Sequence, residues 1–330
     1  MFDAALDEKE LFNFDIKNKV FLCLPKKEHL DKAIHNNINT IQILIKSNIE
    51  QIELLFNKDS NIYKNETIDI IHQTTKNNIK TFCIFEHFFD SFKNKENKEN
   101  KNFLIDFIKN LLKINCSWII LADTNGGTLP HEMEYIMDEL SQHFSLHNFG
   151  IHAHNDLDFA TINSIIAIQK GCRLVQGTWN GMGERCGNAN LISVFCTLYF
   201  KLNYMCCLHN KFTYLTESSN IIKNIFGNRN ADSILPYIGN NAFSHKGGLH
   251  IHAIQKNTTF YEHINPELVG NQRNIILSEY IGTSSLIKIL GERPSTDFLQ
   301  IAKNIIVNEN KELLCIKLKD AYNKFLNEEK

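Results

Sequence analysis

The chain has 330 residues, of which 43% are hydrophobic and 22% are charged, a composition typical of a folded protein with a sizeable core. Its 35 basic and 37 acidic residues give a formal net charge of -2, which argues against a nucleic-acid-binding protein and favours small-molecule partners. The nine cysteines form no C-x-x-C pair, as expected for reduced thiols in the cytoplasm. No signal sequence and no apolar run of membrane-spanning length is recognisable, so no membrane contact is expected.

Six short apolar runs alternate with longer amphipathic segments, a rhythm that predicts a parallel sheet with helices on its outside. The predicted strands are residues 20–24, 41–45, 81–85, 118–122, 149–153 and 174–178. The predicted helices include residues 62–77, 103–113, 130–144 and 160–170. After about residue 210 the strand pattern stops and helical segments continue. We therefore expect an α/β barrel domain over residues 1–210 and a linker with a small, mainly helical subdomain over residues 211–330.

Polar residues follow the predicted strands directly. Glu86, the run from Asp123 to Gly127, the run from His154 to Asp156 and the run from Asn180 to Asn188 each come after an apolar run. In a barrel of parallel strands the chemistry lies at the carboxyl ends of the strands. The low-complexity segment of residues 93–101 is read as a solvated loop or a helix start, with no function assigned.

The fifth predicted strand contains a His-x-His pattern that indicates a metal site. Residues two apart in a strand project from the same face, so His152 and His154 can reach one ion. The amide oxygen of Asn188, from the next strand-end turn, is a third candidate ligand. Two imidazoles and one oxygen leave coordination positions open, as in catalytic rather than structural metal sites.

The same region allows other interpretations. The glycines of the run from Gly181 to Gly187 depart from G-x-G-x-x-G spacing, and the run follows the sixth predicted strand rather than the first, which disfavours dinucleotide binding. Glu184 and Arg185 fit a salt bridge that locks the turn as well as they fit direct catalysis. For the remaining histidines in polar clusters a structural role is the default; these are His87, His131, His245 and His252.

Several long motifs in order resemble the 2-isopropylmalate, homocitrate and citramalate synthase family, and most closely the (R)-citramalate synthases. They are residues 86–90 (EHFFD), 123–132 (DTNGGTLPHE), the histidine pair, 183–190 (GERCGNAN), 243–250 (FSHKGGLH) and 261–271 (YEHINPELVGN).

The resemblance implies a TIM (β/α)8-type barrel that condenses acetyl-CoA with a 2-oxo acid on a divalent metal. With pyruvate as the 2-oxo acid the product is (R)-citramalate, on the route to isoleucine. His152, His154 and Asn188 match the family's metal ligands, with Zn, Mn and Mg as candidate ions. Glu86 and His250 match catalytic positions, and Thr124 and Glu86 match positions facing the 2-oxo acid. A homodimer is implied, because in the family the histidine matched by His250 often comes from the other subunit.

One family motif has no counterpart here. The family's first barrel strand ends in an Asp-Thr-Thr-Leu-Arg-Asp-Gly type motif that supplies an arginine and a metal-binding aspartate. Residues 1–17 resemble instead the helix before the family's third strand, so the first two βα units are expected to be absent, as is the C-terminal regulatory domain. Three explanations stay open: a longer native product, a second polypeptide that completes the barrel, or a decayed, non-catalytic remnant. Within the enzyme class the alternative is a 2-isopropylmalate or homocitrate synthase.

Overall fold

The computed structural model describes residues 20–93, 98–206, 208, 210–227, 230–246, 248–276, 283–308 and 314–328. The chain divides into two compact units, unit 1 from Met1 to Val194 and unit 2 from Phe195 to Lys330. The boundary near residue 210 between the catalytic barrel domain and the helical subdomain stays a prediction. Residues 94–97 of the low-complexity segment lie outside the described residues, and a helix begins at Lys98. Within the described part of the chain, no helix combines the length and the apolar character needed to cross a membrane.

Unit 1 is built on one sheet whose six parallel strands stand in chain order, each hydrogen-bonded to the next. The strands are β1 (Phe21–Cys23), β2 (Thr40–Lys46), β3 (Lys80–Glu86), β4 (Trp118–Asp123), β5 (Phe149–Ala153) and β6 (Leu174–Gln176). All six strand predictions are confirmed. The apolar runs are visible in the sequence because strands of a parallel sheet are buried on both faces.

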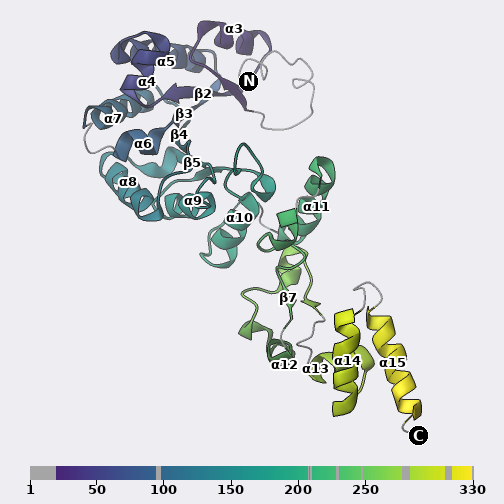
Figure 1. Ribbon diagram of the computed structural model, residues 1–330. Coiled ribbons are helices and arrows are strands. Elements are labelled where there is room, and N and C mark those ends of the chain that lie inside the picture. The colour runs from purple at the N-terminus through teal and green to yellow at the C-terminus, as the bar shows by residue number, and fades with distance from the viewer. Residues whose placement is uncertain are drawn as a thin grey trace. The chain divides into compact units, whose positions relative to one another are not determined.

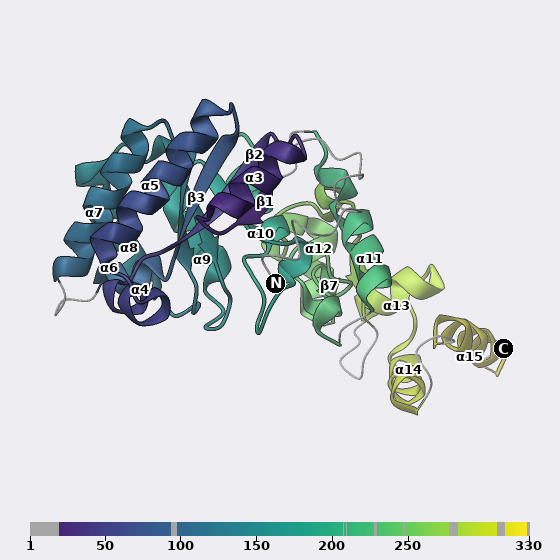
Figure 2. The same ribbon diagram turned by 90° about the horizontal axis from the view of Figure 1, so that it is seen from above.

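Helices connect the strands and cover the outer face of the sheet. They are α3 (Lys27–His35), α4 (Ile49–Phe56), α5 (Ser60–Lys76), α6 (Phe88–Lys93), α7 (Lys98–Lys113), α8 (Pro130–His143) and α9 (Ala160–Gln169), with the short 3-10 helices η1 (Leu146–Asn148) and η2 (Trp179–Gly181). Figures 1 and 2 show α5, α7 and α8 along the outside of the strands. Phe85 of β3 meets Phe107 of α7 edge to face, with ring centroids 5.5 Å apart, so large aromatic side chains fill this layer.

The sheet curves like the wall of a barrel. Inward-facing side chains of different strands form one apolar cluster, which includes Leu44 of β2, Ile84 of β3 and Ile120 of β4. The Gln176 amide of β6 donates a 2.5 Å hydrogen bond to the Gln42 side chain of β2, although three strands separate β6 from β2. Only a curved sheet brings these two strands within reach of one hydrogen bond. The predicted barrel-type α/β fold is therefore confirmed.

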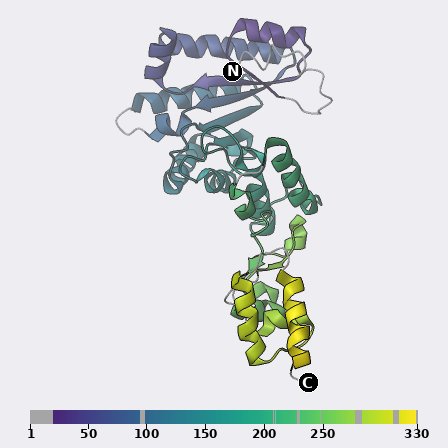
Figure 3. The same cartoon turned by 45° about the vertical axis from the view of Figure 1, so that its right-hand side comes forward.

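Unit 2 is mainly helical, as expected. Its helices are the end of α10 (Leu191–Phe200), α11 (Leu215–Phe226), α12 (Gly248–Lys256), α13 (Thr283–Leu290), α14 (Thr296–Asn308) and α15 (Leu314–Glu328), with the 3-10 helices η3 (Phe212–Tyr214), η4 (Asn230–Ile234), η5 (Thr258–Phe260) and η6 (Pro266–Val269). Two parallel two-residue strands, β7 (Ser244–His245) and β8 (Asn274–Ile275), were not predicted. Helices α14 and α15 lie side by side (Figures 1 and 3), and Leu286, Phe298 and Leu318 are fully buried in the cluster that joins them to α13.

Candidate metal and substrate site

The end of β5 carries the predicted histidine ligands. His152 lies in β5 and His154 directly follows it, so both side chains project from the same face. Their Nε2 atoms are 3.4 Å apart, and the rings meet edge to face with centroids 5.1 Å apart. Two imidazole nitrogens that share one zinc ion at bond lengths of about 2.1 Å lie about 3.4 Å apart in a tetrahedral site. The spacing of the pair therefore fits a shared ion.

Burial keeps both imidazoles uncharged near neutral pH. Desolvation lowers the pKa of His152 to about 4, and repulsion from His154, where that ring is protonated, acts in the same direction. Desolvation also lowers the pKa of His154, assisted by the positive charge of Arg185. Within the described part of the chain, neither Nδ1 atom has a hydrogen-bond partner, and both are buried. A neutral imidazole is the form that binds a metal.

Asn188 reaches the pair from the turn that follows β6. It forms an isolated antiparallel bridge with His154, which places the two residues side by side. Its side-chain Nδ2 donates to the Met182 carbonyl over 3.1 Å, and this bond turns the amide oxygen the other way. Gly183 has a φ of 154°, and a Cβ at this position would collide with Nδ2 of Asn188. The glycine is thus required by the close approach of the Asn188 amide.

The residues at this edge of the sheet fit part of a divalent-metal site. The Asn188 Oδ1 atom is buried and has no partner among the described residues, which leaves it available as an oxygen ligand. No group of three His, Cys, Asp or Glu side chains in the described ranges could hold an ion, so the candidate ligands at this edge remain two imidazoles and one amide oxygen. Such a set leaves positions for water or substrate oxygens.

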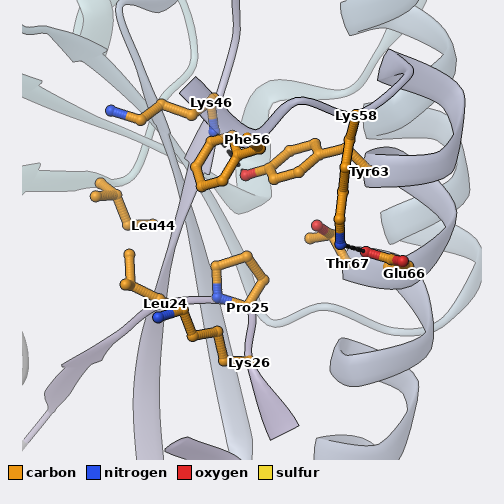
Figure 4. Close-up of a pocket in the computed structure, with 10 residues that line it drawn as sticks. All are labelled: Leu24, Pro25, Lys26, Leu44, Lys46, Phe56, Lys58, Tyr63, Glu66 and Thr67. Atoms are coloured by element: carbon orange, nitrogen blue, oxygen red, sulfur yellow. Dashed lines mark hydrogen bonds and ion pairs between the residues drawn. The ribbon is translucent and has the colours of Figure 1, made fainter. Parts of the chain in front are cut away.

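Glu86 ends β3 beside the end of β2, where its carboxylate forms an ion pair with Lys46. The two residues are register partners on neighbouring strands, and both side chains are mostly buried. Figure 4 shows the Lys46 side chain pointing away from Tyr63, whose hydroxyl accepts a 3.1 Å hydrogen bond from the Lys46 backbone N–H. Sequence reasoning missed this partner, although Lys46 follows the apolar run of residues 41–45 as Glu86 follows residues 81–85.

Thr124 directly follows β4, and its Oγ accepts a 2.8 Å hydrogen bond from the His87 backbone N–H. The bond links the strand-end loops of β3 and β4. Because the hydroxyl is the acceptor in this bond, its own proton remains able to donate to another group. The predicted substrate-facing residues Glu86 and Thr124 therefore stand at the ends of the adjoining strands β3 and β4, and β4 in turn adjoins β5.

His250 belongs to unit 2, where it is an exposed residue of α12. Its ring stacks on Tyr261, with centroids 4.1 Å apart and an interplanar angle of 29°. Tyr261 lies eleven residues further along the chain, and its contact with His250 was not predicted from the sequence. Nearby in the sequence, His245 and Glu262 form a buried pair, in line with the structural role expected of His245.

Comparison with known proteins places the chain in a family. The HMGL-like family matches residues 9–222, which is more than half of the 330 residues. The chain belongs to the HMGL-like family. A second family, described as homocitrate synthase post-HMGL domain-like, matches residues 237–294. The family resemblance read from the sequence motifs is thereby confirmed.

Curated relatives of this HMGL-like chain include (R)-citramalate synthases. The one from Aquifex aeolicus is 44% identical over 207 residues, which are 63% of this chain and 38% of that protein. The one from Geobacter sulfurreducens is 36% identical over 270 residues, 79% of this chain and 47% of that protein. A 2-isopropylmalate synthase from Sulfurisphaera tokodaii is 29% identical over 81% of this chain and 66% of that protein. The chain spans less than half of the length of these two citramalate synthases.

Solved structures agree on the fold of the HMGL-like part. The HMG-CoA lyase of Bacillus subtilis matches with a TM-score of 0.56 and 19% identity, over 68% of this chain and 76% of that one. The HMG-CoA lyase of Pseudomonas aeruginosa matches with a TM-score of 0.55 and 12% identity, over 67% and 75%. At such low identity the likeness establishes the barrel-type fold alone.

Proposed function

We propose that this HMGL-like chain is part of a metal-dependent enzyme that condenses acetyl-CoA with pyruvate to give (R)-citramalate, in the cytoplasm and on the route to isoleucine. The observation that carries the proposal is the convergence of His152, His154 and the buried Asn188 oxygen, which has no partner among the described residues. Thr124 follows the neighbouring strand β4, and Glu86 ends the next strand, β3. Several relatives that are 36% to 44% identical are named (R)-citramalate synthase, which supports pyruvate as the 2-oxo acid.

In this proposal, His152, His154 and Asn188 hold a divalent cation, with Zn, Mn and Mg as candidates. When bound, such a cation polarises a chelated keto group and stabilises the negative charge that develops on its oxygen. The remaining steps belong to side chains. The Thr124 hydroxyl donates to a carboxylate oxygen of the 2-oxo acid, and Glu86 and His250 serve as acid-base residues toward the acetyl methyl and the enolate oxygen.

Lys46 gives Glu86 a defined position in this scheme. The ammonium holds the carboxylate at the strand end, where a carboxylate without a partner would be poorly solvated because its side chain is mostly buried. A homodimer, in which the partner subunit supplies its own copy of the His250 segment, is included in the proposal.

The test is an assay of CoA release and product formation by the full chain with acetyl-CoA, Mn²⁺ and each of three 2-oxo acids. We expect citramalate with pyruvate, and loss of the activity in His152→Ala. Product with 3-methyl-2-oxobutanoate or 2-oxoglutarate, but not with pyruvate, would identify a 2-isopropylmalate or homocitrate synthase instead. No product with any of them, while Mn²⁺ still binds, would favour a non-catalytic remnant or one half of a split enzyme. Native mass spectrometry of the complex would then identify a second polypeptide.

A further inference from the structure

The turn that carries Asn188 has an unusual backbone. Arg185 has a φ of 55°, in the left-handed region, and lies between Gly183 with a φ of 154° and Gly187 with a φ of 93°. Glycine adopts such angles freely, but an arginine does so at a cost in free energy. A non-glycine residue that keeps this conformation needs compensating contacts, and Arg185 has them through its side chain.

The Arg185 guanidinium joins three strand ends. Its Nε donates to Oδ1 of Asp156 over 2.7 Å and its Nη2 donates to Oδ2 over 3.0 Å, a two-pronged ion pair. The same Nη2 donates to the backbone carbonyl of Thr124 over 2.8 Å. Asp156 lies two residues after His154, Arg185 lies three residues before Asn188, and Thr124 follows β4. One side chain therefore connects the loops after β4, β5 and β6.

The backbone around this side chain is packed closely. The Asn155 N–H donates to the Gly187 carbonyl over 3.0 Å, beside the bridge between His154 and Asn188. A Cβ on Gly126 would come within 2.7 Å of both the backbone nitrogen and Oδ2 of Asp156. The loop after β4 thus packs closely against Asp156, and Arg185 links the turn after β6 to the same residue.

We propose that Arg185 and Asp156 form a clamp that positions Asn188 against His154 for cation binding. The inference rests on the metal site of the proposed function, and it assigns Arg185 a positioning role. The three hydrogen bonds occupy Nε and Nη2, and Nη1 lies 3.6 Å from Glu184. The guanidinium is thus committed to the protein's own oxygens, which favours the locking role over direct catalysis.

The direction in which cation affinity changes when Arg185 is removed distinguishes this clamp from a purely electrostatic effect. If Arg185 acted only through its charge, its removal would strengthen cation binding, because a nearby positive charge repels the cation. If it acts as a clamp, its removal frees the turn and weakens binding despite the favourable change in charge. Groups that orient metal ligands typically contribute about 10- to 100-fold in metal affinity.

The experiment measures Mn²⁺ affinity of the full chain by electron paramagnetic resonance titration and Zn²⁺ affinity by calorimetry, with the melting temperature of each metal-free variant. The variants are Arg185→Gln, which removes the charge, and Arg185→Lys, which keeps it but cannot form the two-pronged contact. Glu184→Gln is the matched control, because its exposed side chain adjoins the guanidinium without belonging to the clamp.

We expect affinity about 10- to 100-fold weaker in Arg185→Gln, an intermediate loss in Arg185→Lys and a change below about 2-fold in Glu184→Gln. Asp156→Asn combined with Arg185→Gln should be no weaker than the weaker single variant, because both remove the same clamp. Equal or tighter binding by Arg185→Gln would overturn the clamp and leave the metal site standing. If Arg185→Gln does not fold, unchanged affinity in the charge-preserving Arg185→Lys overturns the clamp equally. Failure of the unchanged chain to bind either ion would refute the metal site itself, and the clamp with it.

Discussion

The buried ion pair of Glu262 and Arg273 in unit 2 is expected to lose different amounts of stability depending on which of its two members is substituted. Arg273 grips it with two hydrogen bonds, of 2.5 Å from Nε and 2.6 Å from Nη2, and His245 lies 3.2 Å away. The Glu262 side chain is 2% exposed, whereas that of Arg273 is 32% exposed. Removing Arg273 leaves a charge in the interior, but removing the Glu262 charge leaves a guanidinium that can reach water.

Arg273→Met should therefore lower the free energy of unfolding by about 3 kcal/mol, as when one partner of a buried ion pair is removed. Glu262→Gln should cost about 1.5 kcal/mol, the contribution of a hydrogen bond to a charged group. The exposed Glu292→Gln serves as a control for loss of a carboxylate, with a change within about 0.5 kcal/mol. The difference between the losses in Arg273→Met and Glu262→Gln, rather than either value alone, tests the effect of burial.

The assay is urea unfolding followed by circular dichroism, with tryptophan fluorescence recorded in parallel. Both tryptophans, Trp118 and Trp179, belong to unit 1, so fluorescence reports on unit 1 and circular dichroism on both units. A loss from Arg273→Met that equals or falls below the loss from Glu262→Gln would refute the reasoning about burial.

The stability that the Glu262 carboxylate contributes should decrease as the pH falls. Burial alone raises the pKa of Glu262, but the hydrogen bonds from Arg273 and His245 outweigh it, and the pKa lies below the ordinary value of 4.5. A lowered carboxyl pKa stabilises the fold above the unfolded-state pKa, and this stabilisation is lost as the pH falls through the folded-state pKa. The stability difference between the unchanged chain and Glu262→Gln should therefore be full at pH 7 and shrink below about pH 4.5.

Two further predictions concern unit 1. Gly183→Ala should weaken Mn²⁺ binding at least about tenfold, because its methyl group collides with the amide of Asn188. Gly227→Ala is the control for backbone strain alone, because Gly227 has a φ of 84° and an added Cβ there would meet no other part of the described chain within 4 Å. Equal Mn²⁺ affinities of the two variants would contradict the collision at Gly183. Cys186 is exposed, so Cys186→Ser should remove one fast-reacting thiol in a disulfide-exchange assay. Cys23→Ser should leave the fast fraction unchanged, since burial raises the pKa of the Cys23 thiol to about 12.

The sequence predicted the sheet well because both faces of its strands are buried. The apolar runs of β1 to β6 therefore carry a signal that does not depend on neighbouring elements. Strands β7 and β8 were missed, because a two-residue strand is too short for any periodicity to be read. The helical character of unit 2 was predicted from the end of the strand pattern, but its internal ion pairs were not.

The candidate site was predictable where residue type and spacing along one element decide the geometry. His152 and His154 share a face because of strand periodicity, and no tertiary information is needed to see it. The partners of Glu86 and Arg185 depend on which strands adjoin: 40 residues separate Glu86 from Lys46, and 29 separate Arg185 from Asp156. The left-handed conformation of Arg185 is likewise set by its tertiary contacts, since nothing in the residue type favours it.

These contacts divide the strand-end site into two parts held in different ways. The side with His154 and Asn188 is fixed by the Arg185 guanidinium and by backbone hydrogen bonds between the loops after β5 and β6. The side with Glu86 is held by one ion pair with a lysine and, through its neighbour His87, by one hydrogen bond to Thr124. Metal ligands need fixed positions, because the ion requires a defined coordination geometry. An acid-base residue can instead be held by a single flexible side chain such as a lysine. The two kinds of contact therefore agree with the separate roles proposed for the two parts.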